Sequence, residues 1–116
     1  MSSISVTELD LLTFFEVMPT LADPEDPWPY NDACYEVAQG EVALSFSIAP
    51  AYRDVRIVLK VGADVLYELN ATGVEDVKYH NDSARESVEV VLNSQDRLLV
   101  WLKPRINVLH EQNERA

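Results

Sequence analysis

Basic side chains are missing from the first 52 residues of this 116-residue chain, which contain neither lysine nor arginine. The same stretch carries nine carboxylates, whereas residues 53–116 carry eleven acids and nine bases. The two parts therefore contribute −9 and −2 to the net charge of −11. Nucleic acids and anionic membranes bind proteins through cationic surface. The sequence thus predicts no nucleic-acid partner and no membrane partner, and it suits a basic protein partner.

Cysteine, glycine and long apolar runs are also scarce. Cys34 is the single cysteine, which excludes an internal disulfide and agrees with a reducing compartment. Three glycines and six prolines are too few for a linker or low-complexity protein. No apolar run approaches the roughly 18 residues of a membrane span, and the first residues lack the cationic start of a signal peptide. We therefore expect a cytoplasmic protein with a single β domain over residues 1–110 and a frayed tail over residues 111–116.

Sequence motifs of catalysis are missing as well. The chain has no Gly-x-Ser-x-Gly, no glycine-rich phosphate loop and no Cys-x-x-Cys. Its two histidines, His80 and His110, lie far apart in the sequence, whereas a zinc site takes three or four ligands at characteristic spacing. We predict no catalytic residue, no metal site and no cofactor.

The best constellation for an enzyme surrounds His80. Glu75, Asp76 and Asp82 are its nearest carboxylates in the sequence, and a histidine beside a carboxylate can transfer protons. Residues 80–83 are predicted to form a polar turn, however, and a solvated turn histidine is the interpretation that we prefer. A hydrolase-like enzyme using His80 with these carboxylates remains an alternative function.

Strict alternation of apolar and polar residues predicts several β-strands. Over residues 41–48, one face would carry Val42, Leu44, Phe46 and Ile48. The same period recurs over residues 54–61, 65–69, 86–92, 97–103 and 106–110, with shorter runs at 35–37 and 77–79. Short turns join 54–61 to 65–69 and 86–92 to 97–103 as two hairpins. About 7–8 short strands without helices between them predict an all-β fold, either an antiparallel β-sandwich or a flattened barrel.

Residues 7–18 have two interpretations. Thr7 and Asp10 resemble a capping box, which would begin a helix. One face of that helix would carry Leu11, Phe14, Phe15 and Met18. One face of a strand would instead carry Leu9, Leu11, Phe15 and Val17. The aromatic pair and the valine favour the strand, so we predict β structure here, with one short N-terminal helix as the alternative.

Residues 19–32 form the most distinctive stretch, because Pro24, Pro27 and Pro29 alternate there with acids and aromatics. We predict a stiff acidic loop without regular structure. Prolines reduce the entropy that a loop loses on docking, and a rigid aromatic beside charge suits recognition. The predicted partner-binding residues are Asp23, Glu25, Asp26, Trp28, Tyr30 and Asp32.

The loop has two other interpretations, a lid over the sandwich and a calcium site. Trp28 would serve as a lid over the end of the sandwich if it folded back, and a large aromatic is usually well buried. A calcium ion would need the Asp-x-Asp-x-Asp-Gly pattern with its distal glutamate, and the acids of this loop lack that spacing. We keep the lid as the alternative and predict no metal in the loop.

Other apolar and aromatic residues suggest two further surfaces. Leu99 and Trp101 alternate with the apolar residues of the predicted strand 97–103, so both faces of that strand would be apolar. Either the strand is covered on both faces, or Leu99 and Trp101 form a patch suited to a homodimer. A sugar-binding face is the other surface, and its candidate residues are Tyr52, Tyr67, Tyr79 and Trp101.

A short domain without catalytic motifs, with its negative charge in one half, suggests a protein-binding role. Such charge favours fast steered association, and a rigid aromatic loop favours anchoring. We therefore predict a non-catalytic acidic interaction module, in its sharpest form an immunity-like inhibitor of a basic toxin domain. The chain resembles toxin immunity proteins in size and charge alone. A sandwich that binds a small molecule or a carbohydrate is the second alternative.

Overall fold

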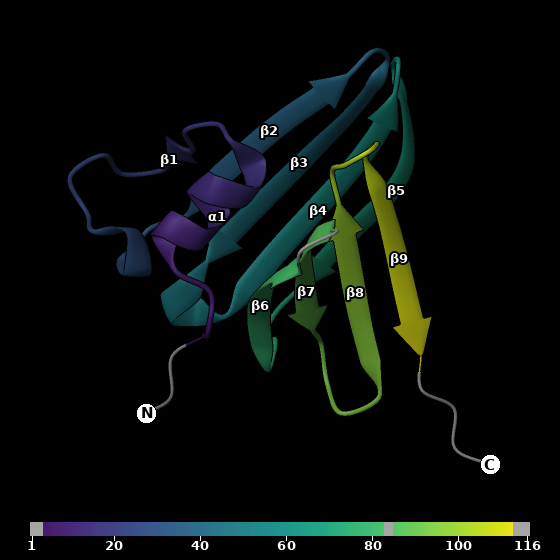
Figure 1. The fold of residues 1–116 in the computed structure, drawn as a ribbon. Coiled ribbons are helices and arrows are strands. Elements are labelled where there is room, and N and C mark those ends of the chain that lie inside the picture. The colour runs from purple at the N-terminus through teal and green to yellow at the C-terminus, as the bar shows by residue number, and fades with distance from the viewer. Residues whose placement is uncertain (1–3, 83–84, 113–116) are drawn as a thin grey trace.

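The structure is a computed structural model that describes residues 4–82 and 85–112. Its strands form two antiparallel sheets (Figure 1). The first sheet contains β1 (Thr20–Leu21), β2 (Ala33–Gln39), β3 (Val42–Ala49), β4 (Asp54–Val61) and β5 (Asp64–Ala71) in that order. The second contains β6 (Asp76–Asp82), β7 (Arg85–Val91), β8 (Asp96–Trp101) and β9 (Asn107–Gln112). This confirms the predicted antiparallel β-sandwich, and the very short β1 is the strand that the sequence pattern did not show.

Every neighbouring pair of strands follows the order of the chain, so each sheet is a meander. The hairpin of β4 and β5 and the hairpin of β7 and β8 are the two predicted from alternation. The predicted polar turn over residues 80–83 is wrong for its described part, because β6 continues through His80 to Asp82 and pairs with β7 along that length. Cross-strand hydrogen bonding therefore overrides the polar composition of this segment.

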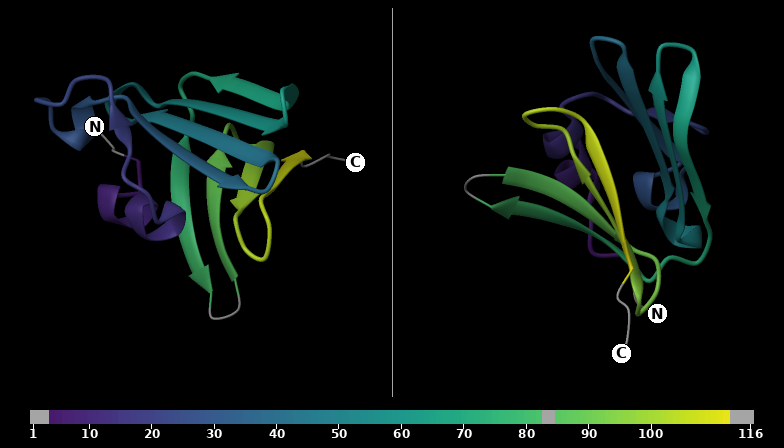
Figure 2. Two further views of the ribbon diagram at one scale, coloured as in Figure 1. Left: turned by 90° about the horizontal axis from the view of Figure 1, so that it is seen from above. Right: turned by 90° about the vertical axis from the view of Figure 1, so that its right-hand side faces the viewer.

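The two sheets diverge on one side and meet on the other, and their strands cross at a wide angle (Figure 2). Alternate residues of the central strands fill the space between them, as the pleat requires. The fully buried members of this core include Leu44, Phe46, Ile57, Val88, Val90, Leu98 and Val100. A contiguous core of this kind positions the loops at the ends of the sandwich.

The N-terminal element is the helix α1 (Glu8–Phe15), which is the alternative that the sequence left open and not the strand that it favoured. A capping box starts the helix, since Asp10 N donates to Thr7 Oγ1 at 3.1 Å and Thr7 N donates to Asp10 Oδ2 at 3.0 Å. Leu11 is fully buried, whereas Leu9 is 69% exposed. A strand would have placed these two leucines on one face, so the helical period accounts for the observed burial.

Helix α1 contacts β2 of the first sheet and β6 and β7 of the second. The Phe15 ring stacks on the Tyr35 ring with centroids 5.0 Å apart, and Phe14 meets Tyr79 edge-on at 6.1 Å. The helix thus closes one side of the sandwich with aromatic contacts to both sheets. Within the described residues, no helix is both long enough and apolar enough to cross a bilayer.

Residues 19–32 contain more regular structure than the sequence predicted. They include the two residues of β1 and the 3-10 turn η1 (Trp28–Tyr30), which begins after Pro27. A second 3-10 turn, η2 (Pro50–Tyr52), follows β3, and the two turns lie side by side. At the other end of the chain, β9 extends to Gln112, two residues past the predicted boundary, and residues 113–116 of the predicted tail lie outside the described part.

Candidate functional site

The acidic loop of residues 22–27 is shaped by the side chain of Asn31. Its Oδ1 accepts hydrogen bonds from Asp23 N at 3.2 Å and Asp32 N at 2.9 Å. Its Nδ2 donates to the carbonyl oxygens of Asp23 at 2.5 Å and Asp26 at 2.9 Å. Asn31 is itself buried, so these four bonds fix the loop from inside. The loop therefore has a defined shape in the absence of a partner.

Trp28 fastens the same loop to the core. Its side chain is only 7% exposed, and its Nε1 donates to the Tyr35 hydroxyl at 3.0 Å. Burial raises the pKa of Tyr35, the hydrogen bond from Trp28 lowers it, and the nearby charge of Glu8 raises it, so the net shift is upward. Trp28 is thus buried, as the lid interpretation expected, and the part that it offers to a partner is small.

Two tyrosines at this end of the molecule are exposed, in contrast to the buried Trp28. Tyr30 ends η1 and is 68% exposed, and Tyr52 ends η2 and is 73% exposed. A cleft of about 590 Å³ lies beside them, with walls formed by the first described residues, η1 and the start of η2. We call the acidic loop, the two 3-10 turns and this cleft the acidic end; it lies at the left of the molecule in Figure 1.

The N-terminal wall of the cleft is held by Asp76. Its two carboxylate oxygens accept hydrogen bonds from Ser5 N and Ser5 Oγ, each at 2.6 Å. Val6 N also donates to the carbonyl oxygen of Val77 at 2.8 Å. Burial alone would raise the pKa of Asp76, but the hydrogen bonds from Ser5 and Val77 outweigh it, and the pKa is lowered. Asp76, which the enzyme hypothesis included, therefore anchors residues 4–8 to the second sheet.

The carboxylates of the acidic loop form no ion pairs with the described residues. Of the nine acids in the first 52 residues, Glu16 is the one that forms an ion pair within residues 4–82 and 85–112, to Lys103 Nζ at 2.8 Å. The predicted site residues Asp23, Glu25, Asp26 and Asp32 are all exposed. Acids of the second half are paired more often, as Arg56 with Glu68 shows. The electrostatic potential around the acidic loop is consequently negative, and the loop geometry fixes the positions of its charges.

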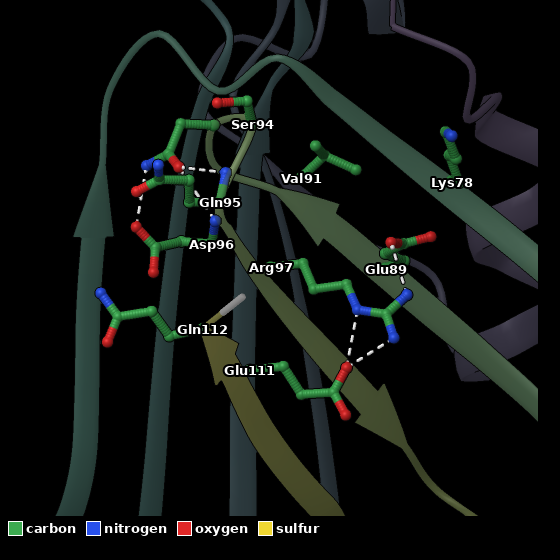
Figure 3. Close-up of a pocket in the computed structure, with 10 residues that line it drawn as sticks. Lys78, Glu89, Val91, Ser94, Gln95, Asp96, Arg97, Glu111 and Gln112 are labelled. Atoms are coloured by element: carbon green, nitrogen blue, oxygen red, sulfur yellow. Dashed lines mark hydrogen bonds and ion pairs between the residues drawn. The ribbon is translucent and has the colours of Figure 1, made fainter. Parts of the chain in front are cut away.

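A second hollow, of about 680 Å³, lies on the outer face of the second sheet (Figure 3). Glu89 is nearly buried there, with its Oε1 2.8 Å from His80 Nε2 and its Oε2 3.2 Å from Arg97 Nη1. Arg97 also donates from Nε to Glu111 at 2.7 Å. Burial alone would raise the pKa of Glu89, but the hydrogen bonds and charges of His80 and Arg97 lower it. The lining of the hollow holds three carboxylates, Glu89, Asp96 and Glu111, against the two cations Lys78 and Arg97, so most of its charge is compensated.

The enzyme constellation predicted from the sequence does not assemble. His80 pairs with Glu89, which that constellation did not include, while Asp76 binds Ser5. Arg97 engages the same Glu89 carboxylate, which is therefore held between two side-chain partners. No group of three or more His, Cys, Asp or Glu side chains in the described chain has an arrangement that would hold a metal ion.

The structure separates the residues of the predicted sugar-binding face, and it half-buries those of the predicted homodimer patch. Tyr67 and Tyr79 pack against the core, Tyr52 lies in η2, and Trp101 lies on β8, so the four aromatics do not form one sugar-binding face. Leu99 and Trp101 are half-buried, and the Arg85 guanidinium lies over the Trp101 ring at 5.6 Å. A homodimer through these two residues stays a prediction.

Sequence reasoning missed Asn31 and Glu89. An uncharged amide within a run of acids was the signal for Asn31, since an amide alone supplies both donors and acceptors. The signal for Glu89 was the hairpin register, which places it opposite Lys78 and diagonal to His80. Both signals become readable only when the strand pairing is known.

Comparison with known proteins gives a likeness in fold. No family model matches the sequence, and no curated protein matches it. A chain in the structure titled "Contact-dependent growth inhibition toxin - immunity protein complex from Klebsiella pneumoniae 342" superposes with a TM-score of 0.77. The match covers 91% of this chain and 93% of that chain at 14% sequence identity. At this identity the likeness shows the fold.

Proposed function

We propose that this protein is an immunity-like inhibitor that binds a basic toxin domain through the acidic end. The observation that carries the proposal is the preorganised, unpaired negative charge of Asp23, Glu25 and Asp26 beside the exposed Tyr30. Fixed charges accelerate encounter with an oppositely charged partner, and an exposed aromatic supplies the contact that persists. The role is binding and not catalysis.

The fold comparison supports the toxin side of this proposal. The similar chain comes from a complex between a growth-inhibition toxin and its immunity protein, and it matches over nearly its whole length. A net charge of −11, to which the first 52 residues contribute −9, suits the inhibitor in such a pair when the toxin is basic. We accordingly propose that the partner is a toxin domain delivered between bacteria and that the protein acts in the cytoplasm.

Co-expression tests the proposal. The chain is produced together with a candidate toxin domain, sought in the reading frames adjacent to its own, and both growth and co-purification are measured. We expect the domain alone to stop growth, and the chain to restore growth and to co-purify with the domain. Continued growth arrest with both proteins present, or restoration without a complex, would contradict the proposal.

A further inference from the structure

The cleft at the acidic end has apolar walls and a charged rim. Its walls are apolar, formed by Ile4, Val6, Trp28 and Pro50, and its lining includes a single carboxylate, that of Glu8. Glu8 is exposed, whereas Ile4, Val6 and Trp28 are buried side chains whose remaining surface faces the cleft. A ligand that fits both parts needs an apolar stem and a charged head.

The charge at the rim selects the sign of that head. Glu8 forms no ion pair within the described residues, and the acidic loop precedes the Trp28 wall in the chain. Arg53 also lines the cleft, but its Nη1 donates to the carbonyl oxygens of Val74 at 3.1 Å and Glu75 at 2.5 Å. Its guanidinium is thus directed at the backbone but keeps its positive charge, so the lining holds one acid and one base, and the excess negative charge at this end comes from the acidic loop that leads into the Trp28 wall.

Arginine matches this geometry better than lysine does. Its aliphatic stem packs on apolar walls, and its planar head stacks on aromatic rings while it donates in a fork to a carboxylate. Trp28 and Tyr30 supply rings, and Glu8 supplies the carboxylate. The Trp28 ring is held by Tyr35, so this wall does not reorganise when a side chain enters.

We propose that this cleft accepts the side chain of one arginine from the basic partner. The proposal rests on the proposed function for the identity of the partner, but the cleft's preference for a guanidinium is a property of this chain alone. Arginine is enriched at protein interfaces and is frequent among the residues that dominate binding energy. Glu8 and the exposed Tyr30 then act as the specificity-determining residues of the cleft, with Trp28 as part of its fixed apolar wall.

A titration of the full chain with small probes tests the cleft without the partner. The probes are N-acetyl-arginine amide and N-acetyl-citrulline amide, which have nearly the same shape but differ in charge. The readout is the indole N–H resonance of Trp28 in a proton–nitrogen correlation spectrum, and Trp101, on the opposite sheet, is the internal reference. We expect saturable shifts of Trp28 with the arginine probe in the millimolar range, and no movement of Trp101.

The variants Glu8→Gln and Glu36→Gln complete the test. Both remove one exposed carboxylate, but Glu36 lies on β2 outside the cleft. We expect Glu8→Gln to weaken the arginine probe about tenfold, equal to about 1.4 kcal/mol, and Glu36→Gln to leave it unchanged. Equal shifts with both probes, no shift with either, or equal effects of both variants would overturn the proposal.

The same variants separate this inference from the proposed function. If the toxin domain binds Glu8→Gln as tightly as it binds the unaltered chain, the arginine cleft fails and the inhibitor function stands. If the arginine probe binds as expected but the candidate toxin domain does not bind the chain, the cleft stands and the inhibitor function fails.

Discussion

Asn31 shows at the scale of one residue how a loop of like charges keeps its shape. Three exposed carboxylates within four residues repel one another, and an unrestrained loop would spread them. The buried amide satisfies two backbone donors and two backbone acceptors of this region, so the carboxylates are held close together at the surface. The proposed basic partner would relieve this repulsion on binding.

Trp28 also acts as a single residue, and because it is buried we expect it to contribute mainly to the stability of the fold. We expect Trp28→Ala to lower the free energy of unfolding by about 3 kcal/mol or more, because it leaves a cavity and removes the hydrogen bond to Tyr35. Tyr30→Ala should leave the melting temperature nearly unchanged, since that side chain is mostly exposed. Thermal melts compare the two, and equal melting temperatures would contradict the buried position of Trp28.

Two carboxylates make the fold sensitive to acid. The pKa values of Asp76 and Glu89 are both lowered in the folded protein. Their stabilisation is therefore complete above the ordinary carboxyl range of about 4 and is lost as the pH falls through the lowered folded-state values.

We predict that the melting temperature falls as the pH falls through this acidic window. Asp76→Asn and Glu89→Gln should each reduce the slope of melting temperature against pH and should each lower stability near neutral pH. Melts of the three proteins at a series of pH values check this. A variant with the slope of the unaltered protein would show that its carboxylate does not contribute.

At the scale of elements, α1 shows that tertiary contacts, and not the local sequence pattern, decide between helix and strand. The sequence contained the capping box, but the aromatic pair favoured a strand, and no local pattern decided between the two. Burial against both sheets decides it, since Phe14 and Phe15 reach aromatic partners on β6 and β2 only from a helix.

The leucines of α1 provide a matched test of that element. We expect Leu11→Asp to unfold the domain, because it places a charge in the core, and Leu9→Asp to have little effect. Far-ultraviolet circular dichroism and thermal melts measure both. A strand would make the two substitutions equally damaging, so equal damage would contradict the helix.

The strands were largely predictable and the site was not, for a physical reason. Alternation in segments such as residues 42–48 follows directly from a half-buried sheet, so the strand faces could be predicted. The acidic loop could be singled out from its prolines and acids. The amide that shapes it reaches residues five and eight positions away, and His80 meets Glu89 nine positions away across a hairpin. The 3-10 turn η2 lies beside the loop through tertiary packing. Such contacts leave no period in the sequence.

At the scale of the whole molecule, charge is divided between the two ends of the first sheet and the outer face of the second. The acidic end carries unpaired carboxylates on a fixed loop, whereas on the second sheet Arg97 forms ion pairs with both Glu89 and Glu111. The turns β2–β3 and β4–β5 lie at the far end of the first sheet, where Glu41 and Asp64 are exposed (Figure 1). The molecule therefore offers two sets of exposed acids that differ in position.

Those two sets make the most direct test of the account. One triple variant neutralises the acidic loop, with Asp23→Asn, Glu25→Gln and Asp26→Asn, and the control removes the same charge with Glu36→Gln, Glu41→Gln and Asp64→Asn. Affinity for the candidate toxin domain is measured by surface plasmon resonance at low and physiological salt. We predict that the loop variant loses about tenfold or more in affinity together with most of the salt dependence, and that the control keeps both. Equal losses in the two variants, or no loss in either, would contradict the claim that the acidic end binds the partner.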